Sequence, residues 1–351
     1  MIRFFRKIRQ RLLAENRFSR YLAYAIGEIL LVVIGILIAL WINNSSQERI
    51  KQERIEATLE AIQNNIVQDT YFSNWLTNRY IRSHQLYTKI FDDQISLENL
   101  SEEEQREIWD ASFQVSVYYI LTSGYAQLME SLNEVPPDYS RLLSKLNLLY
   151  KIRGRTLESM SEENRKIKNN YIDYLKRNQH WAAVDDYRHE VSDAQLEFYR
   201  HNPVFKSHVA SLHWSVMDIM GAHSLYRKDG MEAYIQINEI LGKDESELPK
   251  EIRLTSVATN EDAARLTGVY ELSSGPDDTS VGRQLEVTSE GKDLYITYAG
   301  LEQPRRLLFY HHEKPWFSMV RSSMLLRFET QGENTLSIIN GKRALTHWVK
   351  K

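Results

Sequence analysis

The chain has 351 residues, enough for about two or three folded units, and its formal net charge is −3. This balance argues against DNA or RNA as a partner, because no overall positive field would attract a polyanion. The sequence contains no cysteine, which excludes disulfides, thiolate metal sites and cysteine nucleophiles.

Residues 1–22 form a basic tail with seven arginines and lysines and a single acid, Glu15. Phe5, Ile8 and Leu12 recur at helical spacing within it, which is typical of a helix lying on an anionic membrane surface. The simpler interpretation is that these charges only set the topology during insertion. Either way, the basic excess predicts a cytoplasmic N-terminus and exported C-terminal domains.

Residues 23–42 are a run of 20 predominantly apolar residues, which as a helix would span the ~30 Å hydrocarbon core of a bilayer. A cleavable signal peptide is the alternative, but its apolar region is usually only about 7–15 residues long and ends at small residues. This run ends at Leu40-Trp41-Ile42 instead. We therefore predict an uncleaved, single-pass signal-anchor in the bacterial inner membrane.

The predicted span carries two features of its own. Small residues recur at steps of four, interrupted by Leu31, and Glu28 is an ionisable residue beside them. Small residues allow close helix approach, and ionisable groups in membranes are often functional. We predict a homodimer seam through the span, with a lipid-facing helix as the alternative; the candidate packing residues are Ala23, Gly27, Glu28, Gly35 and Ala39.

Residues 43–245 predict an all-α helical bundle, followed by a polar linker over 246–263. One long helix should leave the membrane, with Ile55, Leu59, Ile62 and Ile66 on its buried side and then Phe72, Leu76 and Tyr80. Ser101 and Glu104 predict a capping box, and Asp138 a cap for a leucine-rich helix. Further helices are expected at about 156–178, 192–201, 204–226 and 230–242, the last ending near Gly242.

Residues 264–351 predict a small domain of seven or eight short strands, an antiparallel β-barrel or sandwich. Hairpin turns are expected at 290–293 and 331–334, and Asn340-Gly341 is a strong two-residue hairpin signal. Alternation with polar neighbours predicts a filled core and gives its inward side chains, which are Leu285, Val287, Leu294, Ile296, Leu326, Phe328, Leu336 and Ile338.

Few residues suggest chemistry. Asp185, Asp186, His189 and Glu190 could share a helical face, but no metal-binding frame such as H-E-x-x-H occurs, and His208 and His213 are five residues apart. There is no G-x-S-x-G motif, no phosphate-binding glycine loop, and no S-x-x-K motif in a usable context. We therefore predict no cofactor, no metal and no catalytic residues.

Aromatic residues are frequent in the helical region. They could line a ligand pocket, although core packing is the more usual cause; the side chains concerned are Trp75, Tyr80, Tyr118, Tyr119 and Tyr125.

Two parts of the sequence resemble known families. The basic tail, the entry Tyr24–Ile29, the core Val33–Leu40 and Asn43-Asn44 resemble a family of uncharacterised single-span membrane proteins from Bacteroidetes-type bacteria. Thr122-Ser123-Gly124-Tyr125 is similar to a turn of the same family. The start of the C-terminal part, Leu266-Thr267-Gly268-Val269-Tyr270, is similar to a lipocalin-like accessory domain of some serine hydrolases. The first resemblance implies the topology and the second the β-fold.

These features predict a non-enzymatic, membrane-anchored periplasmic module that binds or scaffolds an envelope protein or another ligand. One alternative is a sensory domain, which would need a membrane partner because a 22-residue cytoplasmic tail is too short for an output domain. The other alternative is an accessory to an envelope hydrolase.

Overall fold

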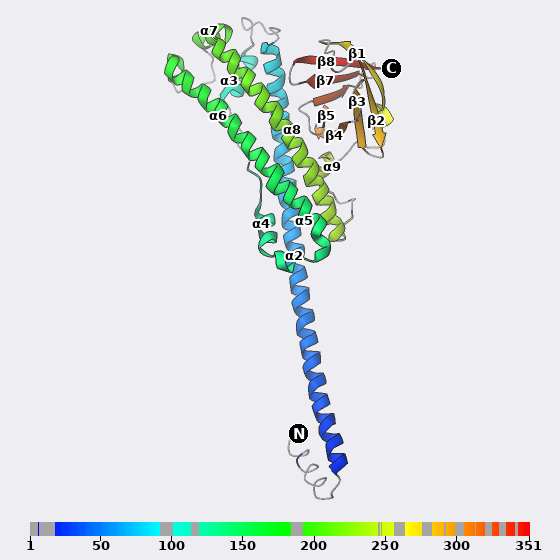
Figure 1. The fold of residues 1–351 in the computed structure, drawn as a ribbon. Coiled ribbons are helices and arrows are strands. Elements are labelled where there is room, and N and C mark those ends of the chain that lie inside the picture. The colour runs from blue at the N-terminus through cyan, green and yellow to red at the C-terminus, as the bar shows by residue number, and fades with distance from the viewer. Residues whose placement is uncertain are drawn as a thin grey trace. The chain divides into compact units, whose positions relative to one another are not determined.

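The computed structural model describes residues 6, 18–91, 101–113, 119–183, 192–244, 246, 248–255, 264–275, 283–290, 293–298, 305–312, 314–319, 325–329, 335–340 and 343–351. The chain divides into two compact units, residues 1–58 and residues 59–351. The described part of the first unit is helical, and the second unit begins with helices and ends with strands (Figure 1).

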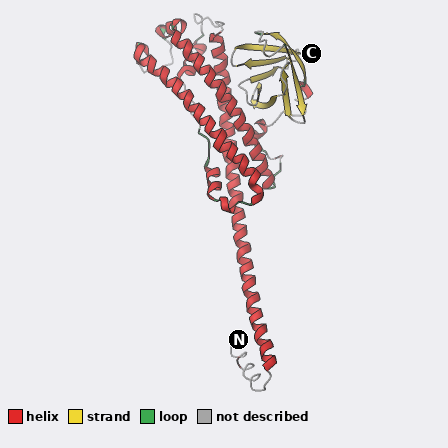
Figure 2. Ribbon diagram, viewed as in Figure 1, coloured by secondary structure: helices red, strands yellow, loops and turns green. Residues whose placement is uncertain are grey.

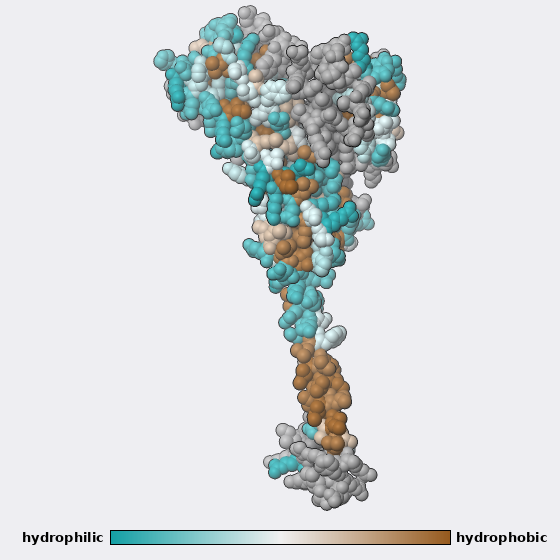
Figure 3. All heavy atoms as spheres, viewed as in Figure 1, coloured by the Kyte–Doolittle hydropathy of each residue, from teal (hydrophilic) through white to brown (hydrophobic). Residues whose placement is uncertain are grey.

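The first unit contains the apolar part of helix α2 (Phe18–Phe91). From Leu22 to Ile42 its large apolar side chains are 46% to 73% exposed, and none of its most apolar window is buried. Figure 3 shows this stretch as a continuous brown band. The described chain thus contains one helix that is long and apolar enough to cross a membrane.

The second unit begins with a helical region. After α2, its described helices are α3 (Glu102–Phe113), α4 (Ser123–Glu130), η1 (Leu132–Glu134), η2 (Pro137–Tyr139), α5 (Ser140–Asn147), the π-helix η3 (Leu148–Gly154), α6 (Arg155–Asn178), η4 (His180–Ala183), α7 (Asp193–His201), α8 (Pro203–Ile240) and α9 (Lys250–Thr255). No strand occurs among the described residues from 43 to 255, so the all-α prediction is confirmed for them.

Helix α2 buries one stripe whose members are alternately four and three residues apart. The stripe comprises Ile55, Leu59, Ile62, Ile66, Asp69, Ser73, Leu76, Tyr80, Ser83, Tyr87 and Ile90, of which only Ser83 is not fully buried. This 4-3 spacing keeps one side of a helix facing its neighbours. The predicted core position of Phe72 is wrong: its side chain is 36% exposed, and Ser73 occupies the seam instead.

Several predicted helix ends are confirmed. Ser101 and Glu104 form the capping box, with the Glu104 carboxylate accepting from the Ser101 backbone N–H at 3.0 Å. The helix expected to begin at 204 begins at Pro203, and the Asn202 side chain, which was not predicted as a cap, accepts from the Val204 backbone N–H. Gly242 follows the end of α8 with a φ of +64°, the left-handed conformation that glycine tolerates best.

Other helix predictions are corrected by the structure. The helices expected at 204–226 and 230–242 are the single helix α8; Gly230 lies inside it, where an added Cβ would come within 3.4 Å of Ile66 and 3.8 Å of Leu149. Asp138 lies in η2 and does not cap α5, whose N-cap position is Tyr139. The expected linker contains α9, which begins directly after Pro249. The helix capped by Ser101 was expected to run through Trp109 and Phe113 to Val117; α3 is described as far as Phe113, and residues 114–118 lie outside the described residues.

The C-terminal strands form a closed antiparallel barrel. Each strand pairs with the next, and β8 pairs back with β1; the strands are β1 (Gly268–Ser274), β2 (Gln284–Glu290), β3 (Asp293–Tyr298), β4 (Arg305–His312), β5 (Lys314–Met319), β6 (Leu325–Glu329), β7 (Thr335–Asn340) and β8 (Arg343–Lys350). Closure leaves no unpaired edge strand. The predicted choice between barrel and sandwich is thereby decided in favour of a barrel. Figure 2 shows its strands in yellow, next to the C-terminus.

The hairpin predictions hold with one shift. Glu290 pairs with Asp293, and Glu329 pairs with Thr335, as expected. Asn340 still belongs to β7 and pairs with Arg343, so the last connection lies one residue later than Asn340-Gly341 suggested.

Of the predicted inward residues, those whose side chains the structure describes are all buried, namely Leu285, Val287, Leu294, Ile296 and Leu336. The side chains of Leu326, Phe328 and Ile338 lie outside the described ones. Tyr270, Tyr298 and Trp348 are also buried, and the last two meet edge to face at 6.4 Å between ring centroids. Bulky aromatic side chains therefore occupy part of the core.

Candidate functional site

The residues predicted to pack the span all lie on the apolar part of α2. Ala23, Gly27, Glu28, Gly35 and Ala39 are exposed, and a Cβ added at Gly27 or Gly35 would meet no atom within 4 Å. Within the described chain this face of α2 is therefore open. The small residues follow the predicted stripe, with Glu28 one position beyond Gly27.

A second concentration of polar side chains lies inside the helical region, where sequence analysis expected an apolar core. Between Asn65 and Thr77, helix α2 buries Asn65, Asp69, Thr70, Ser73, Asn74 and Thr77, and α8 buries His223, Ser224, Arg227, Asp229 and Asn238. Buried polar groups are costly unless they are hydrogen-bonded. We call these buried polar residues of α2 and α8 the polar core. Their hydrogen-bond partners show which helices the polar core joins.

Asn65 holds the start of α4 against α2. Its Oδ1 accepts from the Gly124 backbone N–H at 3.1 Å and from the Ser123 hydroxyl at 3.3 Å. A Cβ at Gly124 would lie only 2.7 Å from the Ile62 backbone nitrogen, so this contact requires glycine. The Ser-Gly-Tyr segment singled out in the sequence is thus a docking point between two helices.

Asp69 lies one turn further along α2. Its carboxylate accepts from the Tyr226 hydroxyl on α8 at 2.7 Å and from the Leu121 backbone N–H at 3.2 Å. Both donors are far away in sequence, and a buried carboxylate strengthens each hydrogen bond it accepts. Asp69 therefore fixes the axial position of α2 relative to α8 and to the segment before α4.

Ser73 and His223 form the next contact between α2 and α8, with 2.8 Å between Oγ and Nδ1. Burial, reinforced by the positive charge of Arg227, lowers the pKa of His223 to about 3, so the imidazole is neutral at physiological pH. Arg227 in turn donates to the Asn74 side-chain oxygen.

A serine beside a neutral histidine resembles a nucleophile and its base. Here, however, both side chains are completely buried. A substrate would have no surface of this pair to reach, and we interpret the contact as structural.

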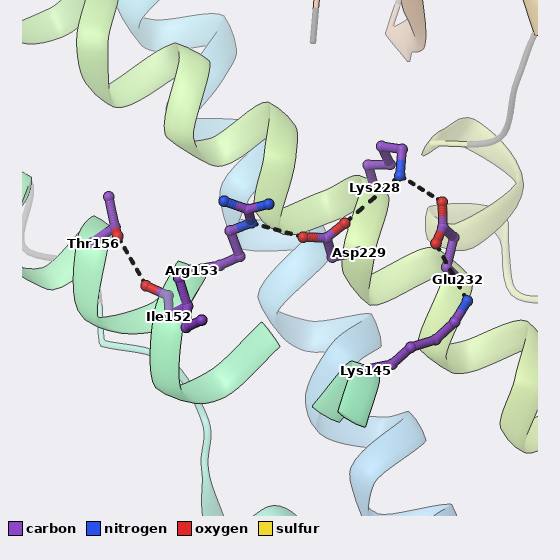
Figure 4. A network of polar contacts seen from close by, with 7 residues as sticks. All are labelled: Lys145, Ile152, Arg153, Thr156, Lys228, Asp229 and Glu232. Carbon is purple, nitrogen blue, oxygen red and sulfur yellow. Dashed lines mark hydrogen bonds and ion pairs between the residues drawn. The ribbon is translucent and has the colours of Figure 1, made fainter. Parts of the chain in front are cut away.

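A chain of alternating charges connects α8 to the run of helix formed by α5, η3 and α6. Figure 4 shows Arg153, Asp229, Lys228, Glu232 and Lys145 in that order. The N–O distances along the chain are 2.7, 3.7, 2.6 and 3.3 Å. Burial raises the pKa of Glu232, but its two ammonium partners outweigh this and hold the pKa below its ordinary value. Arg153 reaches Asp229 from the π-helix, a rare geometry that often marks functional sites.

The aromatic residues proposed to line a ligand pocket differ in burial and do not line a common pocket in the described part of the chain. Tyr80 and Tyr125 are buried, and Tyr125 stacks on Tyr150 at 4.7 Å between ring centroids. Trp75 and Tyr119 are exposed, and Tyr118 lies outside the described residues. The candidate metal residues 185–190 also lie outside them. His208 is buried and its ring stacks on that of Tyr171, so we interpret His208 as a packing residue.

No protein-family model matches the chain, and no curated protein sequence is significantly similar to it.

Proposed function

We propose that this protein is a single-pass, membrane-anchored module whose helical domain and β-barrel bind or scaffold a partner on the exported side. The exposed apolar part of α2 carries this proposal. In water, 20 uncovered apolar residues would be strongly unfavourable, whereas a bilayer matches their length and chemistry. The N-terminal basic residues support a cytoplasmic N-terminus, which makes the other domains periplasmic.

The polar core supports a binding role over a catalytic one. Its hydrogen bonds join helices that are distant in sequence, and its most reactive-looking pair is buried. Buried polar contacts of this kind are best known for fixing the register between helices. A rigid platform with defined helix register suits a scaffold or receptor for an unknown envelope protein.

The open stripe of small residues supports self-association through the span. Glu28 would then face the second helix, where a hydrogen bond between helices could satisfy it. The continuity of α2 from Phe18 to Phe91 favours the sensory alternative, in which a membrane partner receives the signal. An accessory role beside an envelope hydrolase is favoured only by the similarity of the barrel's first strand to such domains.

A topology experiment tests the proposal directly. Alkaline phosphatase is active only when exported and β-galactosidase only in the cytoplasm, so each is fused after Lys351. We expect phosphatase activity and no galactosidase activity. The reverse result would overturn the orientation and the periplasmic function with it. Crosslinking in intact cells, followed by identification of trapped envelope proteins, would separate scaffold from hydrolase accessory.

A further inference from the structure

Helix α2 exposes a cluster of aromatic side chains outside its buried seam. Tyr71 is 63% exposed, Phe72 36% and Trp75 45%. The rings of Phe72 and Trp75 stack on each other, with 5.5 Å between their centroids. A single exposed apolar side chain needs no explanation, but neighbouring ones often mark an interaction surface.

Positive charge continues this surface along α2. The guanidinium of Arg79 lies 5.6 Å from the ring centroid of Trp75, and Arg82 is exposed. Spacings of four and three residues place Trp75, Arg79 and Arg82 on the same side of the helix. We call this surface the aromatic-basic surface; it consists of Tyr71, Phe72, Trp75, Arg79 and Arg82.

The aromatic-basic surface has no acid of its own in the described part of the chain. No described carboxylate forms an ion pair with Arg79 or Arg82. The one acid of α2 between residues 68 and 82 is Asp69, which is buried and already accepts two hydrogen bonds. Both arginines therefore offer hydrogen-bond donors in a fork that matches a carboxylate.

Composition and charge together indicate what kind of partner fits. Tryptophan, tyrosine and arginine are the residues that contribute most often to the binding energy of protein interfaces. Uncompensated positive charge favours an acidic partner, because complementary charges steer association and like charges oppose it. A second copy fits poorly, because two copies anchored in one membrane would run parallel. A two-fold axis at this surface would then bring the same arginines of both copies together.

We propose that the aromatic-basic surface docks an acidic segment of an envelope protein. Apolar side chains of that segment cover the rings of Phe72 and Trp75, and its carboxylates pair with Arg79 and Arg82. Arginine can bind a carboxylate through two parallel hydrogen bonds, and burial of the rings adds apolar contact. This inference rests on the proposed binding function and states the chemistry of the partner.

Photo-crosslinking in intact cells tests the inference on the full chain. The photoreactive amino acid p-benzoylphenylalanine replaces Tyr71 in one variant and Trp214, an aromatic residue of α8 that is 43% exposed, in a control. Mass spectrometry then identifies the peptide that is crosslinked. We expect position 71 to capture an envelope-protein segment rich in Asp, Glu and apolar residues, and position 214 not to capture it. A captured second copy of this chain, a captured lipid, or a segment without acidic excess would overturn the proposal.

Substitutions then assign the contact. Arg82→Glu and Trp75→Ala should each reduce capture at position 71 by roughly tenfold, as the loss of a central interface residue predicts. Lys176→Glu is the matched charge reversal, because Lys176 is exposed on α6, and it should leave capture unchanged. Circular dichroism of each purified variant checks that it is folded. Equal capture in Arg82→Glu and in the unsubstituted chain would contradict the pairing with carboxylates.

The same crosslinks separate this inference from the proposed function. If position 214 captures an envelope protein and position 71 captures none, the binding function stands and the docking surface is wrong. If neither position captures an envelope protein, both proposals fail.

Discussion

From Leu22 to Ile42, helix α2 carries apolar side chains that the described chain leaves uncovered, whereas from Asn65 to Thr77 the same helix buries amides, hydroxyls and a carboxylate. Both stretches reverse the usual relation between polarity and burial. Under the proposed membrane anchoring, the first is explained by its surroundings, since lipid suits apolar side chains. The second is explained by hydrogen bonds, since α4 and α8 supply donors and acceptors at defined positions along α2. Polarity alone therefore does not tell which side of a helix is covered.

Acidification should have the largest effect, and it acts through two histidines that helix α8 buries. His208 and His223 have pKa values of about 3 in the folded protein and about 6.5 when unfolded. Below pH 6.5 the unfolded chain binds protons that the folded chain does not, so stability is complete above pH 6.5 and falls as the pH approaches 3. The free energy of unfolding should drop by up to about 2.7 kcal/mol per pH unit for both groups.

Urea unfolding of the full chain in detergent, repeated from pH 7.5 to pH 4, measures this slope. The double variant Ser73→Ala with His223→Leu removes the buried imidazole together with its partner. The slope should then fall by about half, because one proton-binding group remains. An unchanged slope would show that His223 does not titrate as its burial implies.

Leu76 and Phe72 give a direct comparison between the seam and the exposed side of α2. Leu76→Ala should destabilise the protein by about 2–5 kcal/mol, because it leaves a cavity at a completely buried position. Phe72→Ala should cost less than about 1 kcal/mol, chiefly the lost stacking on Trp75. Urea unfolding compares the two variants, and equal losses would contradict the seam described here.

The sequence predicted this seam only where it is apolar. Ile55, Leu59, Ile62 and Ile66 were assigned correctly because their spacing and chemistry agree. Beyond Ile66 the same 4-3 frame reaches Asp69 and Ser73, which look like surface residues until Tyr226 and His223 are known to face them. Those partners come from α8, more than 140 residues later, and no local pattern indicates them.

The barrel was more predictable than the polar core, again because most of its contacts join residues that are close in sequence. Seven of its eight strand pairs join a strand to the next one in the chain, where alternation and turn residues give local signals; only the β1–β8 pair that closes the barrel joins the two ends of the domain. The polar core depends on contacts between helices that are distant in sequence. Extending the 4-3 frame past Ile66, without requiring apolar residues, was the one signal that could have located Asp69 and Ser73.

Substitution of Asp69 tests whether the hydrogen bonds of the polar core stabilise the folded protein. Asp69→Ala should destabilise the protein by about 2–3 kcal/mol, because the Tyr226 hydroxyl and the Leu121 N–H lose an acceptor in a buried place. Tyr71→Ala is the matched control, since Tyr71 is exposed on the same helix. Unfolding of Asp69→Ala, Tyr226→Phe and the double variant should show coupling, because the two side chains share one hydrogen bond. Strict additivity would contradict the contact.

The apolar stretch of α2 should respond to a change that would be minor in a water-soluble helix. Gly35→Ile adds a bulky side chain to the open stripe of small residues, and it should weaken dimerisation of the span by about 1–2 kcal/mol. Val33→Ile is the control, because it enlarges a side chain two residues away on the opposite side of the helix. A membrane two-hybrid assay of residues 18–50 compares the variants with the wild type. If the wild-type segment gives no dimer signal, or if both substitutions weaken it equally, the small-residue stripe is not a helix interface, and lipid alone explains why this stretch of α2 is uncovered.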